Sequence, residues 1–216
     1  SHGLMLALQA DLEAAGGVVV CNTAVVRLAR RPGGIAVSTD TLELDAAWVV
    51  NCAGLGAPGM ARQLVADVPI GHYARGRYYA YQGPAPFDRL VYPVAEPGGL
   101  GIHVTLDLAG QVRFGPDVEW IDAVDYTFDD SRRADFVAAI ARYFPAVDPA
   151  RVVPAYTGIR PKLAGPDAPA ADFRIDGPAE HGVPGLVNLL GIESPGLTAS
   201  LAIAQYVETL PGLRPC

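Results

Sequence analysis

Cysteine is scarce in this 216-residue sequence, and its three cysteines, Cys21, Cys52 and Cys216, lie far apart. None belongs to a C-x-x-C pair, which excludes a disulfide framework and a zinc site of the usual ligand spacing. A sparse, odd set of thiols is typical of a reduced, intracellular protein, and we therefore predict a cytoplasmic location. Cys21 and Cys52 lie in apolar runs, where we expect them to be buried packing residues.

Basic clusters and long apolar runs are also missing. The formal net charge is −7, and no basic cluster is larger than the pair Arg30–Arg31. Nucleic acid and anionic membranes are therefore poor candidates for partners. The longest apolar runs, such as "AAWVVNCAGLGAPG", are too short and too rich in glycine for a membrane span. Half of the residues are apolar and 18% are charged, which is the balance of a protein with a sizeable core.

The order of predicted elements indicates one discontinuous α/β domain with an antiparallel β domain inserted into it. Residues 1–67 combine a helical apolar spacing, valine-rich strands, a Gly-rich turn and a short helix. Residues 68–154 hold short β-like runs between Gly and Pro turns, with one helix near 131–143 that Ser131 would cap. Residues 155–216 return to the first pattern with a strand, a turn and a helix.

The usual dinucleotide fingerprint is G-x-G-x-x-G directly after a first strand, and no such motif stands in that position here; "GLGAPG" at residues 54–59 is wrongly placed for it. Two other Gly-rich turns follow apolar strands, "VVNCAGLGAPG" and "NLLGIESPGLT". Either turn taken singly is explained by a short loop that needs glycine for steric reasons. Two of them in one domain favour a nucleotide or flavin, because a strand–turn–helix unit lets the backbone approach such a cofactor closely.

Seven motifs, in a characteristic order and spacing, cover nearly the whole chain. They are "VVNCAGLGAPGMARQ", "RGRYYAY", "RLVYPV", "GLGIHVTLDLAG", "FGPD", "YTGIRPKL" and "GIESPGLTASLAIA". The chain thereby resembles FAD-dependent oxidoreductases of the D-amino-acid-oxidase superfamily, and within it those like L-2-hydroxyglutarate dehydrogenase. The resemblance implies the C-terminal portion of a Rossmann-like FAD-binding domain, residues 1–67 and 155–216, with an inserted antiparallel substrate domain, residues 68–154. It also implies that G-x-G-x-x-G lies in an N-terminal segment of about 150 residues, which would be needed to complete the FAD site.

The stretch "GIESPGLTASLAIAQYV" runs from a Pro-Gly turn into an apolar helix whose first amides lack partners within the helix. In one interpretation Ser194 or Thr198 caps a buried helix and nothing binds there. In the other, which the resemblance favours, the flavin pyrimidine lies at this turn. The amides of Gly196, Leu197 and Thr198 would then stabilise negative charge on the reduced flavin. Pro195 would fix the turn, and Gly196 would let the backbone come close.

The resemblance also assigns the adenosine-diphosphate half of FAD to residues 51–54 and the adenine to the backbone of Val25. The residues expected to contact FAD are Val25, Asn51, Cys52, Ala53, Gly54, Gly191, Ser194, Pro195, Gly196, Leu197 and Thr198.

The expected reaction is oxidation of a small 2-hydroxy acid to the 2-oxo acid by hydride transfer to flavin N5. It requires a cation for the carboxylate, a base for the hydroxyl proton and an apolar wall. Arg160 in "GIRPKL" matches the family arginine that grips a carboxylate with its two-pronged donor set. His103 in "GLGIHVTL" is the candidate base, although a histidine in mid-strand is more often structural. His2 is the rival base.

Three further residues are candidates for contact with the substrate. Tyr79 and Tyr92 would line the site with orienting phenol groups, although core packing explains them nearly as well. Pro161 and Lys162 stand where the family is expected to carry a different, more polar pair, and Lys162 would hold a second carboxylate if it faces the site. His72 and His181 are expected to be solvated loop residues.

Two alternative functions stay open at this stage. The first is an FAD-dependent oxidase of amino acids or amines, and the second is a cofactor-free binding module with the same fold. For an oxidoreductase, the terminal electron acceptor would be a quinone or oxygen.

Overall fold

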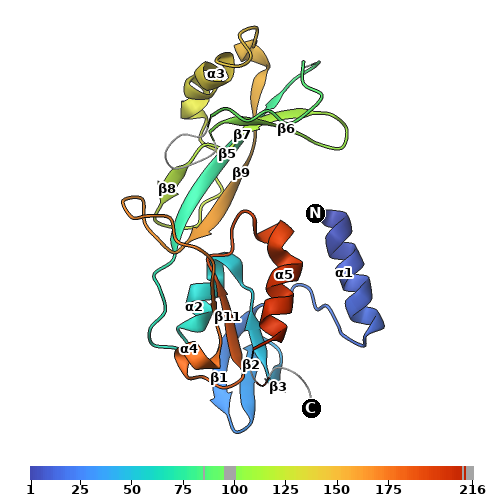
Figure 1. The fold of residues 1–216 in the computed structure, drawn as a ribbon, viewed down its shortest axis with the longest axis vertical. Coiled ribbons are helices and arrows are strands. Elements are labelled where there is room, and N and C mark those ends of the chain that lie inside the picture. The colour runs from blue at the N-terminus through green and yellow to red at the C-terminus, as the bar shows by residue number, and fades with distance from the viewer. Residues whose placement is uncertain (85, 95–100, 211, 213–216) are drawn as a thin grey trace. The chain divides into compact units, whose positions relative to one another are not determined.

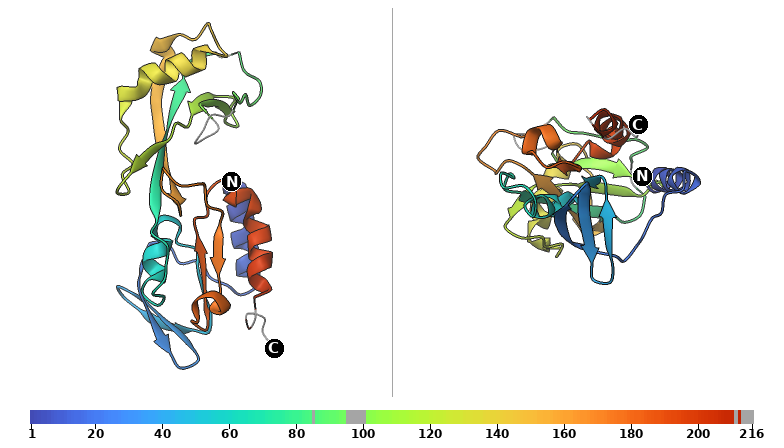
Figure 2. Two further views of the ribbon diagram at one scale, coloured as in Figure 1. Left: turned by 60° about the vertical axis from the view of Figure 1, so that its left-hand side comes forward. Right: turned by 90° about the horizontal axis from the view of Figure 1, so that it is seen from below.

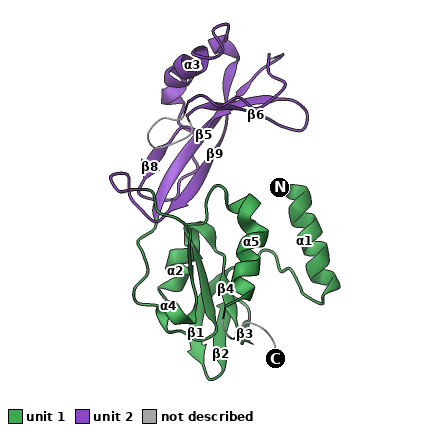
Figure 3. Cartoon of the chain, in the orientation of Figure 1, with its two compact units in different colours: residues 1–71, 170–216 green, residues 72–169 purple. Residues whose placement is uncertain are grey.

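The computed structural model describes residues 1–84, 86–94, 101–210 and 212. Contacts divide the chain into two compact units (Figure 3). Unit 1 comprises residues 1–71 and 170–216, and unit 2 comprises residues 72–169. The chain thus leaves unit 1, builds unit 2 and returns, as the predicted insertion requires. Cys216 lies outside the described residues.

The described residues of unit 1 form two three-stranded sheets and four α-helices (Figure 1). The first sheet is an antiparallel meander of β1 (Val25–Arg31), β2 (Gly34–Thr39) and β3 (Glu43–Ala46). The second has the order β10-β11-β4, formed by Arg174–Asp176, Leu186–Leu190 and Val49–Asn51. Strands β11 and β4 are parallel although 137 residues separate their paired asparagines. The helices are α1 (His2–Ala14), α2 (Ala57–Ala61), α4 (Pro178–His181) and α5 (Gly196–Glu208), with a 3₁₀ turn, η1, at Gly54–Gly56.

The buried core of unit 1 lies between the meander and the second sheet, and includes Leu28, Ile35, Val183 and Leu186. Helix α1 takes no part in it, because none of its residues is buried. It lies at the outside of unit 1 in the views of Figures 1 and 2. Within the described residues, no helix is long and apolar enough to cross a membrane.

Unit 2 is built on one antiparallel sheet. Its long central strand β5 (His72–Tyr81) pairs along its length with β9 (Val152–Lys162). On the other side of β5 lie β7 (Val112–Gly115) and β8 (Glu119–Ile121), and β6 (His103–Leu106) pairs with β7. Helix α3 (Arg133–Ala141) covers one face (Figure 1). There its Phe136 and Ile140 pack in one cluster with Tyr79, Tyr81 and Phe114.

The predicted fold class, α/β with an inserted antiparallel sheet, agrees with these elements, but several details differ. The valine-rich strand begins at Val25, and "VVVCN" before it is not a strand. Of the segment "RLVYPVA", the described residues 89–94 contribute an isolated bridge between Val91 and Val104 and no strand. Strand β9 continues past residue 154 to Lys162, because its whole length pairs with β5, and unit 2 ends at residue 169.

Two local expectations are wrong. Cys21 and Cys52 are exposed rather than buried, since neither the segment before β1 nor the turn after β4 is covered by other described residues. Ser131 does not cap a helix with its side chain. Instead the Asp129 carboxylate accepts the Ser131 amide at the start of a 3₁₀ turn, η2 (Asp130–Arg132), that leads into α3.

Candidate functional site

In unit 1, the two Gly-rich turns leave neighbouring parallel strands at the same edge of the sheet. Asn51 at the end of β4 is opposite Asn188 of β11, and both side chains are buried. The Asn51 side-chain amide donates to Asn188 Oδ1 and to the Ala57 carbonyl, both at 2.9 Å. Its Oδ1 accepts the Ala53 amide at 3.2 Å. Ligands of α/β sheets bind beyond such carboxyl ends, so this hydrogen-bonded pair holds both turns at the position expected of a cofactor site.

Asn51 was expected to contact FAD. The hydrogen-bonding groups of its side chain, the amide donors and Oδ1, are instead bonded to other residues of the protein. This gives it the role of fixing the turn that follows. Asn188 was not singled out from the sequence, although it lies inside the motif "NLLGIESPG". Its importance depends on a partner 137 residues away. Of the other turn residues, Cys52 and Ala53 are exposed, and Gly54 has a φ of 56°, which favours glycine.

The start of helix α5 lacks the side-chain cap that one of the two interpretations of its turn assumed. Its N-cap residue is Pro195, and no side chain caps it. The Thr198 hydroxyl donates to the Pro195 carbonyl at 2.9 Å instead of accepting an amide. Among the described residues, the amides of Leu197 and Thr198 have no acceptor, while Gly196 donates to Glu193. A 13-residue helix therefore presents uncapped amides and its positive dipole end, the arrangement that suits an electron-rich flavin edge.

Gly196 has a packing reason to be glycine within the turn itself. A Cβ at this position would lie 2.6 Å from Ile192 Cγ2. Gly191, at the end of β11, is buried and has a φ of 67°. Ser194, Pro195, Leu197 and Thr198 are exposed, so the remainder of the turn is accessible to a ligand. Val25 opens β1 beside a bulge and is also exposed.

In unit 2, the face of the sheet opposite α3 carries the candidate substrate residues. Side chains alternate along a strand, and paired residues share a face. The core residues Tyr79, Tyr81 and Phe114 therefore define one face, and their neighbours define the other, which we call the open face. The open face includes Ala74, Gly76 and Tyr78 of β5, Tyr156, Gly158 and Arg160 of β9, His103 and Thr105 of β6, Arg113 of β7 and Trp120 of β8.

His103 is buried in the open face, and its tautomer follows from its partner. Nδ1 lies 3.0 Å from the Gly101 carbonyl, which can only accept, so Nδ1 carries the proton in the neutral ring. Burial lowers the pKa of His103, opposed by this hydrogen bond and assisted by the charge of Arg160. The Tyr92 ring stacks on the imidazole with centroids 4.3 Å apart. The ring is thus held neutral with Nε2 unprotonated, and no hydrogen bond to Nε2 is found in the described part of the chain.

Arg160 differs from the other arginines on the strands of unit 2. Arg75, Arg77 and Arg113 are paired with carboxylates, whereas Arg160 forms no ion pair within the described residues. It interacts with the Tyr78 hydroxyl, and this opposes the rise in the pKa of Tyr78 that burial causes. A half-buried guanidinium without a carboxylate, beside a neutral histidine, is suited to receive the carboxylate of a ligand.

Aromatic rings surround Arg160 and His103 on the open face. Tyr78 and Tyr156 are stacked with centroids 4.7 Å apart, and Arg113 lies over the Tyr156 ring. Tyr156, Tyr92 and Trp120 are exposed. These rings form an apolar wall beside Arg160 and His103. Tyr78, Tyr156 and Trp120 were not singled out from the sequence, because sequence alone does not tell which face of the sheet α3 covers.

The expectation for Tyr79 is wrong. It is fully buried, packs on Phe128 and Phe136, and donates its hydroxyl to Asp130 at 2.9 Å. Tyr92, in contrast, lies on His103. Lys162 of β9 is opposite His72 of β5 in the strand register, and it therefore lies on the same face of the sheet as Arg160.

The other three histidines have different surroundings. His2 begins α1 in unit 1 and is exposed. His72 begins β5 and is half-buried, so it is not the solvated loop residue expected. The same correction applies to His181. It ends α4, its Nδ1 accepts the Val183 amide, and its Nε2 is buried.

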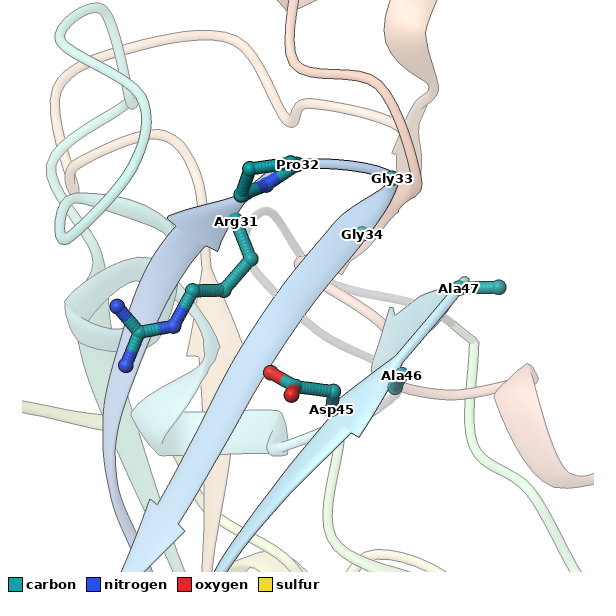
Figure 4. A pocket seen from close by; sticks show the side chains of 7 residues that line it. All are labelled: Arg31, Pro32, Gly33, Gly34, Asp45, Ala46 and Ala47. Atoms are coloured by element: carbon teal, nitrogen blue, oxygen red, sulfur yellow. The ribbon is translucent and has the colours of Figure 1, made fainter.

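A separate hollow of ≈ 310 Å³ lies at the β1–β2 turn (Figure 4). Arg31, whose guanidinium is bound to Glu43, and Asp45 are its charged lining residues. It contains none of the predicted site residues. The residues that the structure describes hold no cluster of His, Cys, Asp and Glu suited to a metal ion.

The fold, the uncapped turn and the open face together define a class of protein, and comparison with known families agrees. Residues 1–210 match the model of the family described as FAD dependent oxidoreductase, and the chain belongs to this family. It is 50% identical over 182 residues to the mitochondrial L-2-hydroxyglutarate dehydrogenase of Arabidopsis thaliana, covering 77% of this chain and 38% of the plant protein. It is 28% identical over 188 residues to a glycerol 3-phosphate dehydrogenase of Caloramator mitchellensis, covering 85% of this chain and 37% of that protein. The chain thus spans less than two fifths of the length of these relatives.

Solved structures of the same kind share the fold. L-alpha-glycerophosphate oxidase of Mycoplasma pneumoniae, with FAD bound, superposes with a TM-score of 0.77 at 24% identity, covering 94% of this chain and 53% of that one. A mutant of NikD, an amino acid oxidase, gives a TM-score of 0.72 at 19% identity, covering 99% of this chain and 59% of that one. At these identities the likeness establishes the fold, and substrates must be argued from this chain's own residues.

Proposed function

We propose that this chain is part of a flavoenzyme that oxidises a small 2-hydroxy acid, of the L-2-hydroxyglutarate type, to the 2-oxo acid. The observation that carries the proposal is the pair on the open face, an arginine without a carboxylate beside a neutral histidine. The identity of 50% to a plant L-2-hydroxyglutarate dehydrogenase supports the same substrate class.

Unit 1 would hold FAD. The uncapped amides of Leu197 and Thr198 would face the flavin pyrimidine, and the turn after Asn51 would take the adenosine-diphosphate half. Bound FAD supplies the acceptor for the hydride that leaves the carbinol carbon. The helix end stabilises the charge that this transfer creates without reorganising, because its amides are already oriented.

Unit 2 would bind the acid and remove its proton. Arg160 donates both prongs of its guanidinium to the carboxylate, which orients the hydroxyl-bearing carbon. His103 accepts the hydroxyl proton at Nε2 while its Nδ1 proton stays on the Gly101 carbonyl. Tyr92 and the Tyr78–Tyr156 pair exclude water from the reacting atoms. The carbinol C–H bond is lost as hydride and the hydroxyl hydrogen is lost as a proton. The electron pair of the O–H bond then forms the C=O bond of the 2-oxo acid.

We further propose that a G-x-G-x-x-G segment outside these 216 residues completes the FAD site. Helix α1 has no buried residue and exposes Leu4, Met5, Leu6, Leu8 and Leu12, and the three valines at 18–20 are exposed as well. Such a contiguous set of apolar side chains is typical of an interface. The chain alone is therefore expected to bind FAD weakly, and stoichiometric, tightly held FAD on the isolated 216 residues would contradict this.

The test is anaerobic reduction of the flavin-loaded enzyme. L-2-hydroxyglutarate should bleach the absorbance of the oxidised flavin, and glycine and glycerol 3-phosphate should not. Bleaching by an amino acid instead would favour an amino-acid oxidase, and bleaching by glycerol 3-phosphate would favour the activity of the 28% relative. A colourless protein that takes up no FAD would indicate a binding module.

Two finer points are proposals as well. The terminal electron acceptor would be a quinone or oxygen, which stopped-flow reoxidation of the reduced flavin distinguishes. The cytoplasmic location remains a prediction from the cysteine content, whereas the plant relative is named as mitochondrial. Fractionation of cells that express the tagged protein would decide between the two.

A further inference from the structure

Two glycines lie opposite each other in the centre of the open face. Gly76 of β5 pairs with Gly158 of β9. On one side of this pair lie Tyr78 and Tyr156, and on the other lie Ala74 and Arg160. Glycine in the interior of a strand costs about 0.5–1 kcal/mol relative to alanine, so each position calls for a physical reason.

Packing explains Gly76 but not Gly158. A Cβ at Gly76 would lie 2.6 Å from the Pro116 Cβ, so the fold itself excludes a side chain there. A Cβ at Gly158 would meet no atom within 4 Å among the described residues. The φ angle of Gly158 is also outside the left-handed region, so its backbone does not require glycine. The missing side chain at Gly158 therefore leaves space rather than relieving a clash.

The space above Gly158 lies between the groups that would hold the substrate. Arg160 and Tyr156 are each two residues from Gly158 along β9 and share its face. The charge of the Arg160 guanidinium lowers the pKa of both Tyr78 and His103 relative to what burial and their other contacts would give. If Arg160 holds the carboxylate of the acid and the hydroxyl of the acid lies at His103, the rest of the acid extends over the neighbouring surface of the sheet.

We propose that Gly158 is a specificity-determining residue, whose missing side chain admits the part of a 2-hydroxy acid beyond its hydroxyl-bearing carbon. This inference rests on the proposed function. It predicts that a side chain at position 158 selects against long acids and spares short ones. One methylene too many in a closed pocket typically changes kcat/KM by about 10- to 200-fold.

The experiment compares Gly158→Ala and Gly158→Val with the unmodified flavin-loaded enzyme. Steady-state kinetics are measured with L-2-hydroxyglutarate and with L-lactate, which has only a methyl group beyond the same carbon. We expect Gly158→Ala to lower kcat/KM for L-2-hydroxyglutarate at least about 10-fold, and Gly158→Val to lower it further. The value for lactate should change less than about threefold, with the melting temperature and FAD content unchanged.

Gly76→Ala is the matched control on the paired strand. Because it meets Pro116, it should lower the melting temperature and affect both acids alike. Equal losses for both acids in Gly158→Ala, or no loss, would overturn the inference. A lower FAD content in Gly158→Ala would also overturn the inference, because the space above Gly158 would then be occupied by the cofactor. If the unmodified enzyme oxidises neither acid while holding FAD, the proposed function itself fails.

Discussion

Replacement of Arg160 tests the carboxylate site most directly. Arg160→Lys keeps the charge and loses the two-pronged donor set, whereas Arg160→Gln loses both. Removing one partner of a desolvated charge pair costs about 2–5 kcal/mol. Arg160 is half-buried rather than enclosed, so we expect Arg160→Gln to fall at the lower end, about 2–3 kcal/mol. That corresponds to a loss of roughly 30- to 160-fold in kcat/KM.

The same two variants separate binding from proton removal through their pH dependence. Burial, assisted by the charge of Arg160, holds the pKa of His103 below 6.5. The acidic limb of kcat/KM, where the free enzyme's base becomes protonated, is therefore expected below pH 6.5. Removing the Arg160 charge should raise the pKa of His103 and move this limb to higher pH. Arg160→Lys should leave the limb in place while raising KM.

The assay is steady-state oxidation of L-2-hydroxyglutarate between pH 5 and 9, with FAD content measured for every variant. Above pH 8 the histidine is neutral in all variants, so the loss measured there is the cost of binding alone. A loss below threefold above pH 8 would show that Arg160 does not hold the carboxylate. An acidic limb that stays at the same pH in Arg160→Gln would refute the electrostatic coupling between Arg160 and His103.

Three further predictions concern the base, the buried amide pair and the turn. His103→Ala should lower kcat by about 10²–10⁴-fold with KM nearly unchanged and remove the acidic limb, and near-normal kcat would exclude it as the base. In Asn188→Ala the side-chain amide of Asn51 loses one of its two acceptors, which should lower the free energy of unfolding by about 1–3 kcal/mol. That is roughly 2–12 °C in the melting temperature, and calorimetry that shows no shift would contradict it. Gly196→Ala should lower FAD content. If Ile192→Ala restores it, the glycine serves packing against Ile192, and if it does not, the glycine serves the cofactor.

The sequence was sufficient where chemistry is local. The turn before α5, with its proline, glycine and apolar helix, could be recognised because its residues are contiguous. His103 and Arg160 could be named as candidates because each lies in a compact motif of the family. The alternation of helical and β-like segments also predicted the inserted antiparallel sheet, whose strands follow from their own periodicity and turns.

The tertiary structure alone decided which face of each strand is buried in the core. Tyr78 and Tyr79 are adjacent and chemically identical, yet α3 buries one in the core and leaves the other beside Arg160. The pairing of Asn51 with Asn188 and of Gly76 with Gly158 joins segments that are distant in the chain. The period of a strand predicts that its side chains alternate, but the side that becomes covered depends on packing between distant segments, which no local pattern records.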